Sequence, residues 1–328
     1  MLKKNKIGIC FLASNEMGYG HLYRSIYLGN LLKIKYNVFL ISNCNSKTVS
    51  VDADNINFIY SEENNFKTYL SKNYFDVLII DKLNNDKKDI LLYKRCSGKV
   101  ILIDDMGDFT SLADVLINPT SVLPLQHPSK SFFGVEYFVF NNELEYFAKK
   151  PLILNNEIKN VLMAFGGSDP NKISEIMIPI VKKHKNIMFS LVIGPGYSGI
   201  EQFINLYQNI SNLNIFVNAS NMPELIYYSD ICICSGGVTM YECAYLHKKM
   251  VVACQVPDQI DNIYFLEKYA DIINLGVINN YQQNKLKLLE DFLENNNPII
   301  TKKCLPLING KYKIMNIINE LMEEISNG

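Results

Sequence analysis

The chain has 328 residues, of which 48% are hydrophobic and 20% charged, a composition typical of a folded globular protein and not of a disordered one. Its 32 Lys and Arg residues nearly balance 33 Asp and Glu residues, and the sequence holds no basic tract, so nucleic acid is not an expected partner. The length exceeds what one hydrophobic core usually serves, which predicts two domains with a ligand cleft between them.

Neither a signal peptide nor a membrane span is expected. The apolar run at residues 7–13, which follows a basic start, is too short for a signal peptide, and no stretch stays apolar for the ~20 residues of a spanning helix. We therefore predict a cytoplasmic protein without an integral membrane segment. The 8 cysteines form no Cys-x-x-Cys pair, and His127, His184 and His247 lack partners at ligand spacing, so no metal site is predicted.

Short apolar runs alternate with helix-like stretches along the whole chain, a pattern typical of parallel sheets covered by helices on both faces. In the first half, strands are expected at residues 7–13, 37–42, 56–60, 77–80, 100–103 and 115–118. Apolar residues at helical spacing predict the first helix at 22–34. The pattern therefore predicts one doubly wound domain for this half.

The second half repeats the arrangement, with strands expected at residues 161–165, 189–193, 215–217, 231–234, 251–254 and 272–275. Lys149, Lys150 and Pro151, followed by a polar stretch, indicate the boundary. We predict an N-terminal domain at 1–150 and a C-terminal domain at 151–328. The last helix, 312–325, could pack on either domain.

The first strand leads into a Gly-x-Gly-His turn, where the first helix is expected to begin. Gly18 and Gly20 allow a ligand to approach the backbone closely, and the helix N-terminus offers free N–H groups to an anion. The third glycine of a dinucleotide-binding motif is replaced by Tyr23, with Arg24 after it. His21 at this sheet edge suits proton transfer or a phosphate contact, while a turn or capping histidine is the alternative.

Two glycine loops follow strands of the second half. The first contains Gly166, Gly167, Ser168 and Asp169; it either exposes backbone N–H groups to a diphosphate or forms a tight turn with a helix cap. The second runs from a Gly-Gly turn into a helix and contains Ser235, Gly236, Gly237, Val238, Thr239 and Glu242. It suits a diphosphate at the helix N-terminus and ribose hydroxyls on Glu242, the alternative being a solvated glutamate.

Further polar residues are expected at the same strand ends. Gln259 and Asn262 follow the strand at 251–254 and could bind sugar hydroxyls or belong to a solvated loop. Asp81, and Asp104 with Asp105, follow strands of the first half and could serve in acid-base chemistry, bind sugar hydroxyls or cap helices. Because parallel strands bind ligands at their carboxyl ends, the loops of each half should converge on one site.

The ordered motifs resemble one known family. They lie at residues 18–24 (GYGHLYR), 103–105 (IDD), 134–137 (GVEY), 166–171 (GGSDPN) and 235–242 (SGGVTMYE). With the two α/β halves, they resemble the UDP-sugar hydrolases of pseudaminic acid biosynthesis (PseG) and the related spore-coat polysaccharide proteins (SpsG). The resemblance implies the MurG-like GT-B fold, in which two Rossmann-like domains with doubly wound parallel sheets face an interdomain cleft.

The same resemblance implies a function. Family hydrolases release UDP from UDP-2,4-diacetamido-2,4,6-trideoxy-β-L-altropyranose by inverting attack of water at the anomeric carbon, without a metal or other cofactor. His21 would activate or orient that water, and a UDP-activated amino sugar would be the partner. Predicted substrate contacts are Gly18, Gly20, Arg24, Asp81, Asp105, Gln259 and Asn262; predicted nucleotide contacts are Gly166, Gly167, Ser168, Asp169, Ser235, Gly236, Gly237, Val238, Thr239 and Glu242.

The chain departs from the hydrolase pattern in two places. Lys82, Leu83 and Asn84 follow Asp81 where those hydrolases usually carry a tyrosine, which is closer to the spore-coat branch, and residues 141–142 are Asn-Asn where the pattern has an arginine. A glycosyltransferase, in which an acceptor hydroxyl replaces water, is therefore the alternative within the fold. A non-catalytic sugar-nucleotide-binding subunit is the alternative from another class.

Overall fold

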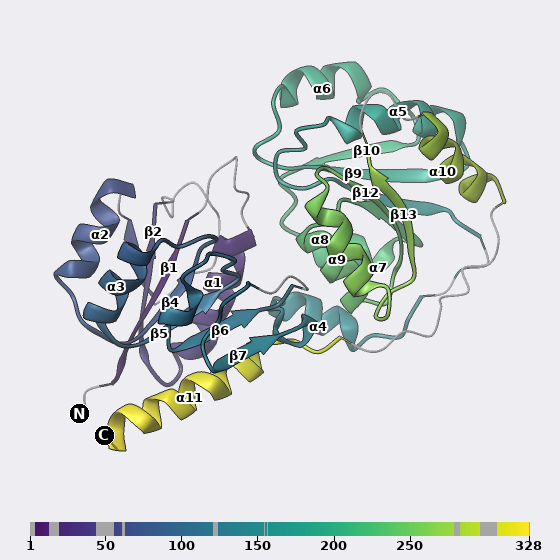
Figure 1. Cartoon of the computed structure of the whole chain (residues 1–328). Coiled ribbons are helices and arrows are strands. Elements are labelled where there is room, and N and C mark those ends of the chain that lie inside the picture. Colours follow the sequence, from purple (N-terminus) through teal and green to yellow (C-terminus); the bar gives the residue numbers. More distant parts are fainter. Residues whose placement is uncertain are drawn as a thin grey trace. The chain divides into compact units, whose positions relative to one another are not determined.

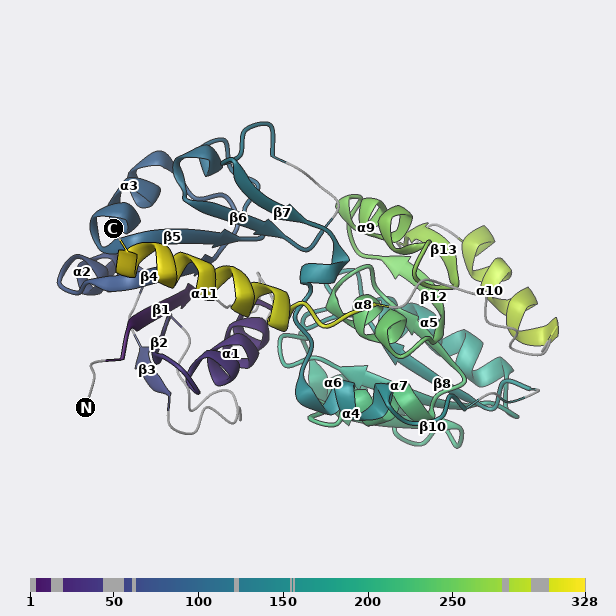
Figure 2. The same ribbon diagram turned by 90° about the horizontal axis from the view of Figure 1, so that it is seen from below.

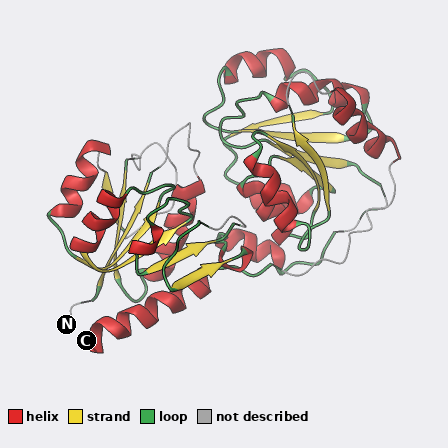
Figure 3. Cartoon of the chain, viewed as in Figure 1, coloured by secondary structure: helices red, strands yellow, loops and turns green. Residues whose placement is uncertain are grey.

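The computed structural model describes residues 4–12, 20–43, 56–60, 63–120, 124–153, 155, 157–278, 283–295 and 307–327. The chain divides into two compact units (Figures 1 and 3). Unit 1 comprises Met1–Asn141 and Ile308–Gly328, and unit 2 comprises Asn142–Leu307. Each is a parallel sheet with helices on both faces, so the predicted fold class of two doubly wound α/β domains is confirmed.

Unit 1 is built on a parallel sheet of seven strands in the order β3-β2-β1-β4-β5-β6-β7. Its strands are β1 (Lys6–Phe11), β2 (Asn37–Ser42), β3 (Asn57–Tyr60), β4 (Phe75–Asp81), β5 (Ser97–Ile103), β6 (Val115–Asn118) and β7 (Lys130–Phe133). Its helices are α1 (Gly20–Leu32), α2 (Glu63–Ser71), α3 (Lys87–Arg95) and α11 (Lys311–Asn327), with the 3-10 turns η2 (Thr110–Leu112) and η3 (Val135–Tyr137).

The strands of unit 1 are apolar on both sides because helices cover both faces of the sheet. Val77 and Ile79 of β4 belong to the core under α1 and α11, whereas Leu78 and Ile80 belong to the core under α2 and α3. This alternation follows from the two-residue period of a strand. It explains why the sequence shows continuous apolar runs instead of alternating ones.

Unit 2 has a parallel sheet of six strands in the order β10-β9-β8-β11-β12-β13. The strands are β8 (Asn160–Ala164), β9 (Met188–Ile193), β10 (Leu213–Val217), β11 (Ile231–Cys234), β12 (Lys249–Cys254) and β13 (Ile272–Val277). The helices are α4 (Asn142–Ala148), α5 (Ile173–Lys183), α6 (Ile200–Tyr207), α7 (Met222–Tyr228), α8 (Val238–Tyr245), α9 (Asp258–Leu266) and α10 (Gln283–Asn295).

Every strand expected from the sequence has a counterpart in the structure, and one further strand was missed. β7 is only four residues long, lies at the edge of its sheet and is half-buried or exposed along its length. Such a strand has no continuous apolar run to reveal it. Among the described helices, none combines the length and apolarity that a membrane span requires.

The division of the chain differs from the expected domains 1–150 and 151–328 at both ends of unit 2. Helix α4 packs with α7 through Phe147, whose ring lies 5.1 Å from that of Tyr227. Helix α11 returns to unit 1 and lies along its sheet (Figure 2), where its apolar face joins the core of β1 and β4. Unit 2 therefore begins before the polar stretch near residue 150, and it ends where the chain returns to unit 1 at Ile308.

A side-chain clasp holds the returning segment in unit 1. The Asn309 amide binds both backbone groups of Phe140: Oδ1 accepts from the N–H at 3.1 Å and Nδ2 donates to the carbonyl at 2.8 Å. Gly310 next to it donates its N–H to the Phe138 carbonyl at 2.7 Å. A Cβ on Gly310 would lie 2.2 Å from the Tyr137 carbonyl carbon, so this close approach requires glycine.

The packing of α11 predicts a local stability effect. Ile318 is fully buried on this helix against the sheet, so Ile318→Ala should lower the free energy of unfolding by about 2–5 kcal/mol, because the cavity adds to the lost apolar burial. Glu320→Ala on the exposed side of the same helix should change it by less than about 0.5 kcal/mol. Urea denaturation measures both variants, and equal stabilities would contradict the placement of α11 in the core.

Candidate functional site

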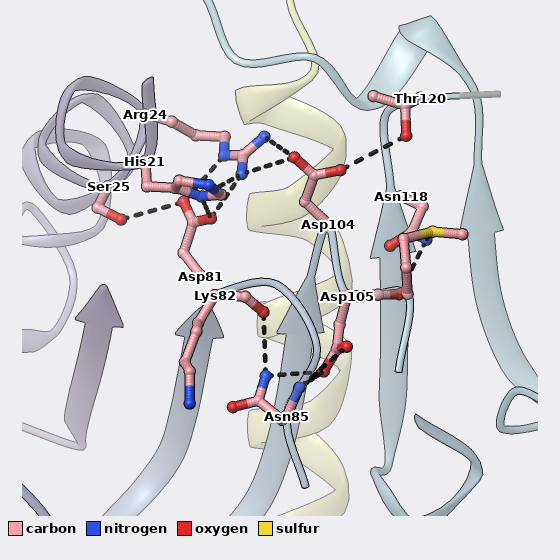
Figure 4. A network of polar contacts seen from close by, with 11 residues as sticks. His21, Arg24, Ser25, Asp81, Lys82, Asn85, Asp104, Asp105, Asn118 and Thr120 are labelled. Atoms are coloured by element: carbon pink, nitrogen blue, oxygen red, sulfur yellow. Dashed lines mark hydrogen bonds and ion pairs between the residues drawn. The ribbon is translucent and has the colours of Figure 1, made fainter. Parts of the chain in front are cut away.

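The carboxyl edge of the unit 1 sheet collects polar side chains from several elements (Figure 4). Asp81 is the last residue of β4, and Asp104 directly follows β5 beside it. Helix α1 begins at Gly20, so His21, Arg24 and Ser25 lie on one of its faces at spacings of three and four residues. These five side chains form one hydrogen-bonded network, which we call the His21 cluster.

Asp81 is the centre of the His21 cluster. Its carboxylate is 1% exposed and accepts from Arg24 through two atoms, Nε at 2.9 Å and Nη2 at 2.5 Å. The Ser25 hydroxyl donates to it at 3.2 Å. Burial alone would raise the pKa of Asp81, but the charges and hydrogen bonds of Arg24 and His21 outweigh burial and lower this pKa to about 2. Asp81 is thus a fixed negative charge at neutral pH.

The contact between His21 and Asp81 defines the tautomer of the imidazole. His21 Nδ1 lies 2.6 Å from Asp81 Oδ1, and two lone pairs cannot approach this closely, so Nδ1 carries the proton and donates it. In the neutral ring, Nε2 then holds the lone pair. The side chain is 14% exposed. A partly exposed imidazole oriented by a buried carboxylate is the arrangement of a general base.

Arg24 joins Asp81 to a second carboxylate. Its Nη1 and Nη2 each lie 3.2 Å from Asp104 Oδ2, and Nη2 is also 3.0 Å from His21 Nδ1. Burial would lower the pKa of Arg24, but the two carboxylates outweigh it and raise this pKa. The guanidinium therefore holds the cluster together instead of reaching for a ligand, which differs from the substrate contact expected of Arg24.

Two other predicted substrate contacts face inward as well. Asp81 binds within the His21 cluster, and Asp105 is completely buried, where it accepts from Asn85 Nδ2 at 2.7 Å and from the Gly107 N–H at 2.8 Å. The role that fits Asp105 is to tie two loops together. Of the predicted residues in the Gly-x-Gly turn, Gly20 starts α1 and Gly18 lies outside the described residues.

Asp104, and not the predicted Asp105, is the carboxylate that enters the cluster. Its backbone has φ +60, in the left-handed region that an Asp residue tolerates better than most. This turn breaks the alternation of the strand, so side-chain direction could not be inferred from the spacing of two consecutive aspartates. The side chain of Asp104 is 18% exposed.

In unit 2, loops after four strands gather at the carboxyl edge of the sheet. Those after β8, β11 and β12 were expected, and the loop after β9 was missed. A Cβ on Gly194 would lie 2.4 Å from the Gly167 carbonyl oxygen, and the Gly196 N–H donates to that oxygen at 2.8 Å. The Gly-Pro-Gly sequence after a strand was the available signal. Gly166, Gly167 and Ser168 all remain partly or fully exposed beside it.

Asp169, a predicted nucleotide contact, instead caps a helix. Its two carboxylate oxygens accept from the N–H groups of Ile173 and Ser174 at 2.9 Å, and Gln255 Nε2 donates to it at 2.6 Å. Asp169 is buried. The positive end of α5 is therefore already neutralised from within the protein, which leaves less for a bound anion.

Helix α8 is different because no side chain caps its N-terminus. Gly237 is its N-cap residue, no acidic residue lies in its first turn, and Val238 and Thr239 reach the surface. The first N–H groups of a helix have no intrahelical acceptor and attract an anion. This terminus is the best candidate for a diphosphate among the helices at the edge.

The predicted sugar contacts Gln259 and Asn262 shape the α8 turn from behind. Gln259 Oε1 accepts from the Gln255 N–H at 2.8 Å, and Asn262 Nδ2 donates to the Gly236 carbonyl at 3.1 Å. A Cβ on Gly236 would lie 2.7 Å from Gln259 Cβ and 2.9 Å from its carbonyl oxygen. Gly236 is thus required by packing, and Ser235 beside it is also buried.

Glu242 carries an unusual carboxyl group. It lies on α8 just after the first turn and is half-buried. Removal from water raises its pKa to about 7, and no hydrogen bond to its carboxylate is found among the described residues. A carboxyl group whose pKa is raised by burial, close to the N-terminus of a helix, is typical of ligand sites. In the described part of the chain, no group of three or more acidic, His or Cys residues is placed to hold a metal.

The pKa of Glu242 predicts how stability depends on pH. A solvated glutamate has a pKa near 4.5. Between pH 4.5 and 7, Glu242 is therefore still protonated in the native state but already ionised in the unfolded chain. The stability from this group is present below pH 4.5 and is lost through pH 7. Glu242→Gln should therefore be more stable than the parent above pH 7, by on the order of 2 kcal/mol.

Urea denaturation across this pH range measures the difference. Glu267→Gln, which makes the same chemical change at another position of unit 2, serves as the matched control. A Glu242→Gln difference that does not grow with pH would contradict the shielded state of Glu242.

No protein-family model matches the chain. An uncharacterized protein of Methanocaldococcus jannaschii, MJ1062, is 30% identical over 271 residues, covering 76% of this chain and 56% of that protein; the chain thus spans little more than half its length. The spore coat polysaccharide biosynthesis protein SpsG of Bacillus subtilis is 21% identical, over 97% of this chain and 99% of that protein.

Solved structures share the fold along nearly the whole chain. MurG of Acinetobacter baumannii has a TM-score of 0.62 at 15% identity, with 96% of this chain and 99% of that chain covered. MnaA of S. aureus with UDP has a TM-score of 0.64 at 10% identity, with 97% of each covered. UDP-GlcNAc 2-epimerase of Neisseria meningitidis bound to UDP-GlcNAc has 0.59 at 12%, with 96% and 100% covered. The chain therefore has the GT-B fold.

Proposed function

We propose that the chain is an enzyme acting on a UDP-activated sugar, with His21 as its general base. The observation that carries this is the 2.6 Å contact between His21 Nδ1 and the buried Asp81 carboxylate. It directs the lone pair of a neutral imidazole to Nε2, and it supplies a fixed negative charge that stabilises the imidazolium formed by proton uptake.

The nucleotide is assigned to unit 2. The uncapped N-terminus of α8 suits the diphosphate, with the accessible backbone of Gly237 and Val238 as donors. Glu242, whose carboxyl lacks a donor among the described residues, suits the ribose hydroxyls, because their hydrogen bonds would favour its ionised form. Gly166, Gly167 and Ser168 add an accessible backbone turn at the same sheet edge.

The similar proteins support a nucleotide-sugar ligand. The solved structures with the same fold include complexes with UDP, UDP-GlcNAc and UDP-glucose. The full-length resemblance to SpsG, a protein of spore coat polysaccharide biosynthesis, is consistent with a role in polysaccharide biosynthesis. The uridine base and the enzyme class are part of our proposal and rest on these likenesses together with the α8 turn and the His21 cluster.

The reaction we propose is hydrolysis. Water attacks the anomeric carbon as its proton passes to His21 Nε2, a bond forms from the water oxygen to that carbon, and the bond to the diphosphate oxygen breaks with inversion. UDP departs with the bonding electrons. The substrate we name is a UDP-2,4-diacetamido-2,4,6-trideoxyhexose, as the motif resemblance indicates, and no metal is needed for these steps.

A glycosyltransferase is the second candidate. The SpsG resemblance and the Lys82-Leu83-Asn84 sequence after Asp81 favour it, since the same base would then deprotonate an acceptor hydroxyl. Incubation with the UDP-2,4-diacetamido sugar and no acceptor separates the two, with UDP and free sugar followed by NMR. We expect release of both, the sugar having the inverted anomeric configuration. Turnover that begins only after an acceptor is added would replace hydrolysis by transfer, and UDP binding without turnover in either case would indicate a binding subunit.

The base role of His21 predicts a separation of turnover from nucleotide binding. His21→Ala should lower kcat by about 10²–10⁴-fold, since a positioned general base is removed, and should change the Kd for UDP less than about threefold, because the proposed UDP contacts belong to unit 2. Asp81→Asn should also lower kcat strongly, because the amide removes the negative charge and no longer holds the His21 imidazole in the productive tautomer.

His127→Ala provides the control, because His127 is an exposed histidine of the same unit. It should keep both constants within about twofold of the parent chain. Stopped assays give kcat, and calorimetry gives the Kd for UDP. Loss of UDP affinity in His21→Ala with kcat unchanged at saturation would show that His21 binds phosphate instead.

A further inference from the structure

The His21 cluster has an excess of negative charge that the proposed base does not require. Arg24 contributes one positive charge and is bound to two carboxylates, Asp81 bidentately and Asp104 through Oδ2. With the imidazole neutral, the cluster carries one net negative charge. An arginine neutralised in this way is a poor ligand for a phosphate or a carboxylate.

The two carboxylates differ in access. The side chain of Asp81 is 1% exposed and that of Asp104 is 18% exposed, so the excess charge meets the solvent at Asp104. Its Oδ2 binds Arg24, while Oδ1 accepts one long hydrogen bond of 3.4 Å from the Thr120 hydroxyl. A carboxylate oxygen can accept two hydrogen bonds, so Oδ1 retains acceptor capacity at the surface.

Asp104 also lies beside the proposed base. The same Arg24 nitrogen, Nη2, is 3.0 Å from His21 Nδ1 and 3.2 Å from Asp104 Oδ2, and Asp104 comes one residue after the position that pairs with Asp81 in the sheet. Figure 4 shows the two side chains on either side of the guanidinium. A sugar whose anomeric carbon is at His21 therefore has ring substituents within reach of Asp104.

We propose that Asp104 selects the sugar by its substituents, accepting hydrogen bonds from O–H or N–H donors next to the reacting carbon and repelling sugars that carry a carboxylate. This inference rests on the proposed function and adds the substrate class: neutral or cationic hydroxyl- and amide-bearing sugars, with uronic acids excluded. The selection is electrostatic, because an acidic group on the sugar would meet a like charge with no free cation in the cluster.

Asp104→Asn is the variant that tests this role. Asparagine has the same shape and tolerates the left-handed backbone at φ +60, so the variant should fold, which its thermal melting curve checks. Asp104→Ala would place a strained residue there and is avoided. Asp291→Asn, which makes the same chemical change at an exposed position of α10, controls for the net charge of the chain.

The experiment measures binding of UDP, UDP-GlcNAc and UDP-glucuronic acid by calorimetry to the full chain. We expect the parent chain and Asp291→Asn to prefer UDP-GlcNAc over UDP-glucuronic acid by roughly ten- to hundredfold, the range of a charge-assisted hydrogen bond exchanged for repulsion. In Asp104→Asn this ratio should fall to within about threefold, while the Kd for UDP stays unchanged.

The outcomes separate the two proposals. A parent chain that binds UDP but does not distinguish the two sugars, or a ratio that persists in Asp104→Asn, overturns the role of Asp104 and leaves the proposed function standing. Failure of all three ligands to bind overturns the proposed function, and the role of Asp104 with it. A loss of selectivity that Asp291→Asn shares equally would assign the effect to net charge and also overturn the role.

Discussion

The buried Asp81 carboxylate is the interaction on which the proposed chemistry depends. It ends a central strand of unit 1 and accepts hydrogen bonds from Arg24, Ser25 and His21, all on the first turns of α1. A buried carboxylate is costly unless such donors surround it. Its full set of donors makes it stay ionised, fixes α1 relative to β4 and orients the imidazole.

Unit 2 uses a buried carboxylate for the opposite purpose. Asp169 occupies the N-terminus of α5 and so withdraws one helix end from ligand binding, whereas α8 has neither a side-chain cap nor an acidic first turn. Both helices follow glycine turns at the same sheet edge, and their anion-binding capacity is decided by one carboxylate. The comparison of α5 with α8, more than either glycine motif alone, supports the assignment of the diphosphate.

The fold was predictable from the sequence because strands buried on both faces leave continuous apolar runs, and twelve of them were recognised. The half-exposed β7 has no such run. The return of α11 to unit 1 depends on Asn309, which binds Phe140 at a separation of 169 residues in the sequence, and on Gly310, which lies directly against the Tyr137 backbone. For the candidate site, the apolar pattern of the sequence located the strand ends, but it did not show in which direction the side chains there point. At the left-handed turn of Asp104, it is Asp104 and not the predicted Asp105 that enters the His21 cluster.

The distribution of charge differs between the two candidate sites, one in each unit. The His21 cluster pairs one arginine with two carboxylates, so it favours neutral donors over anions. The α8 terminus offers N–H groups and a positive dipole end without a competing carboxylate. A nucleotide sugar has a doubly charged diphosphate at one side of the anomeric bond and hydroxyl or amide donors at the other. The α8 terminus therefore suits the diphosphate of our proposed substrate, whereas the charge of the His21 cluster disfavours such an anion.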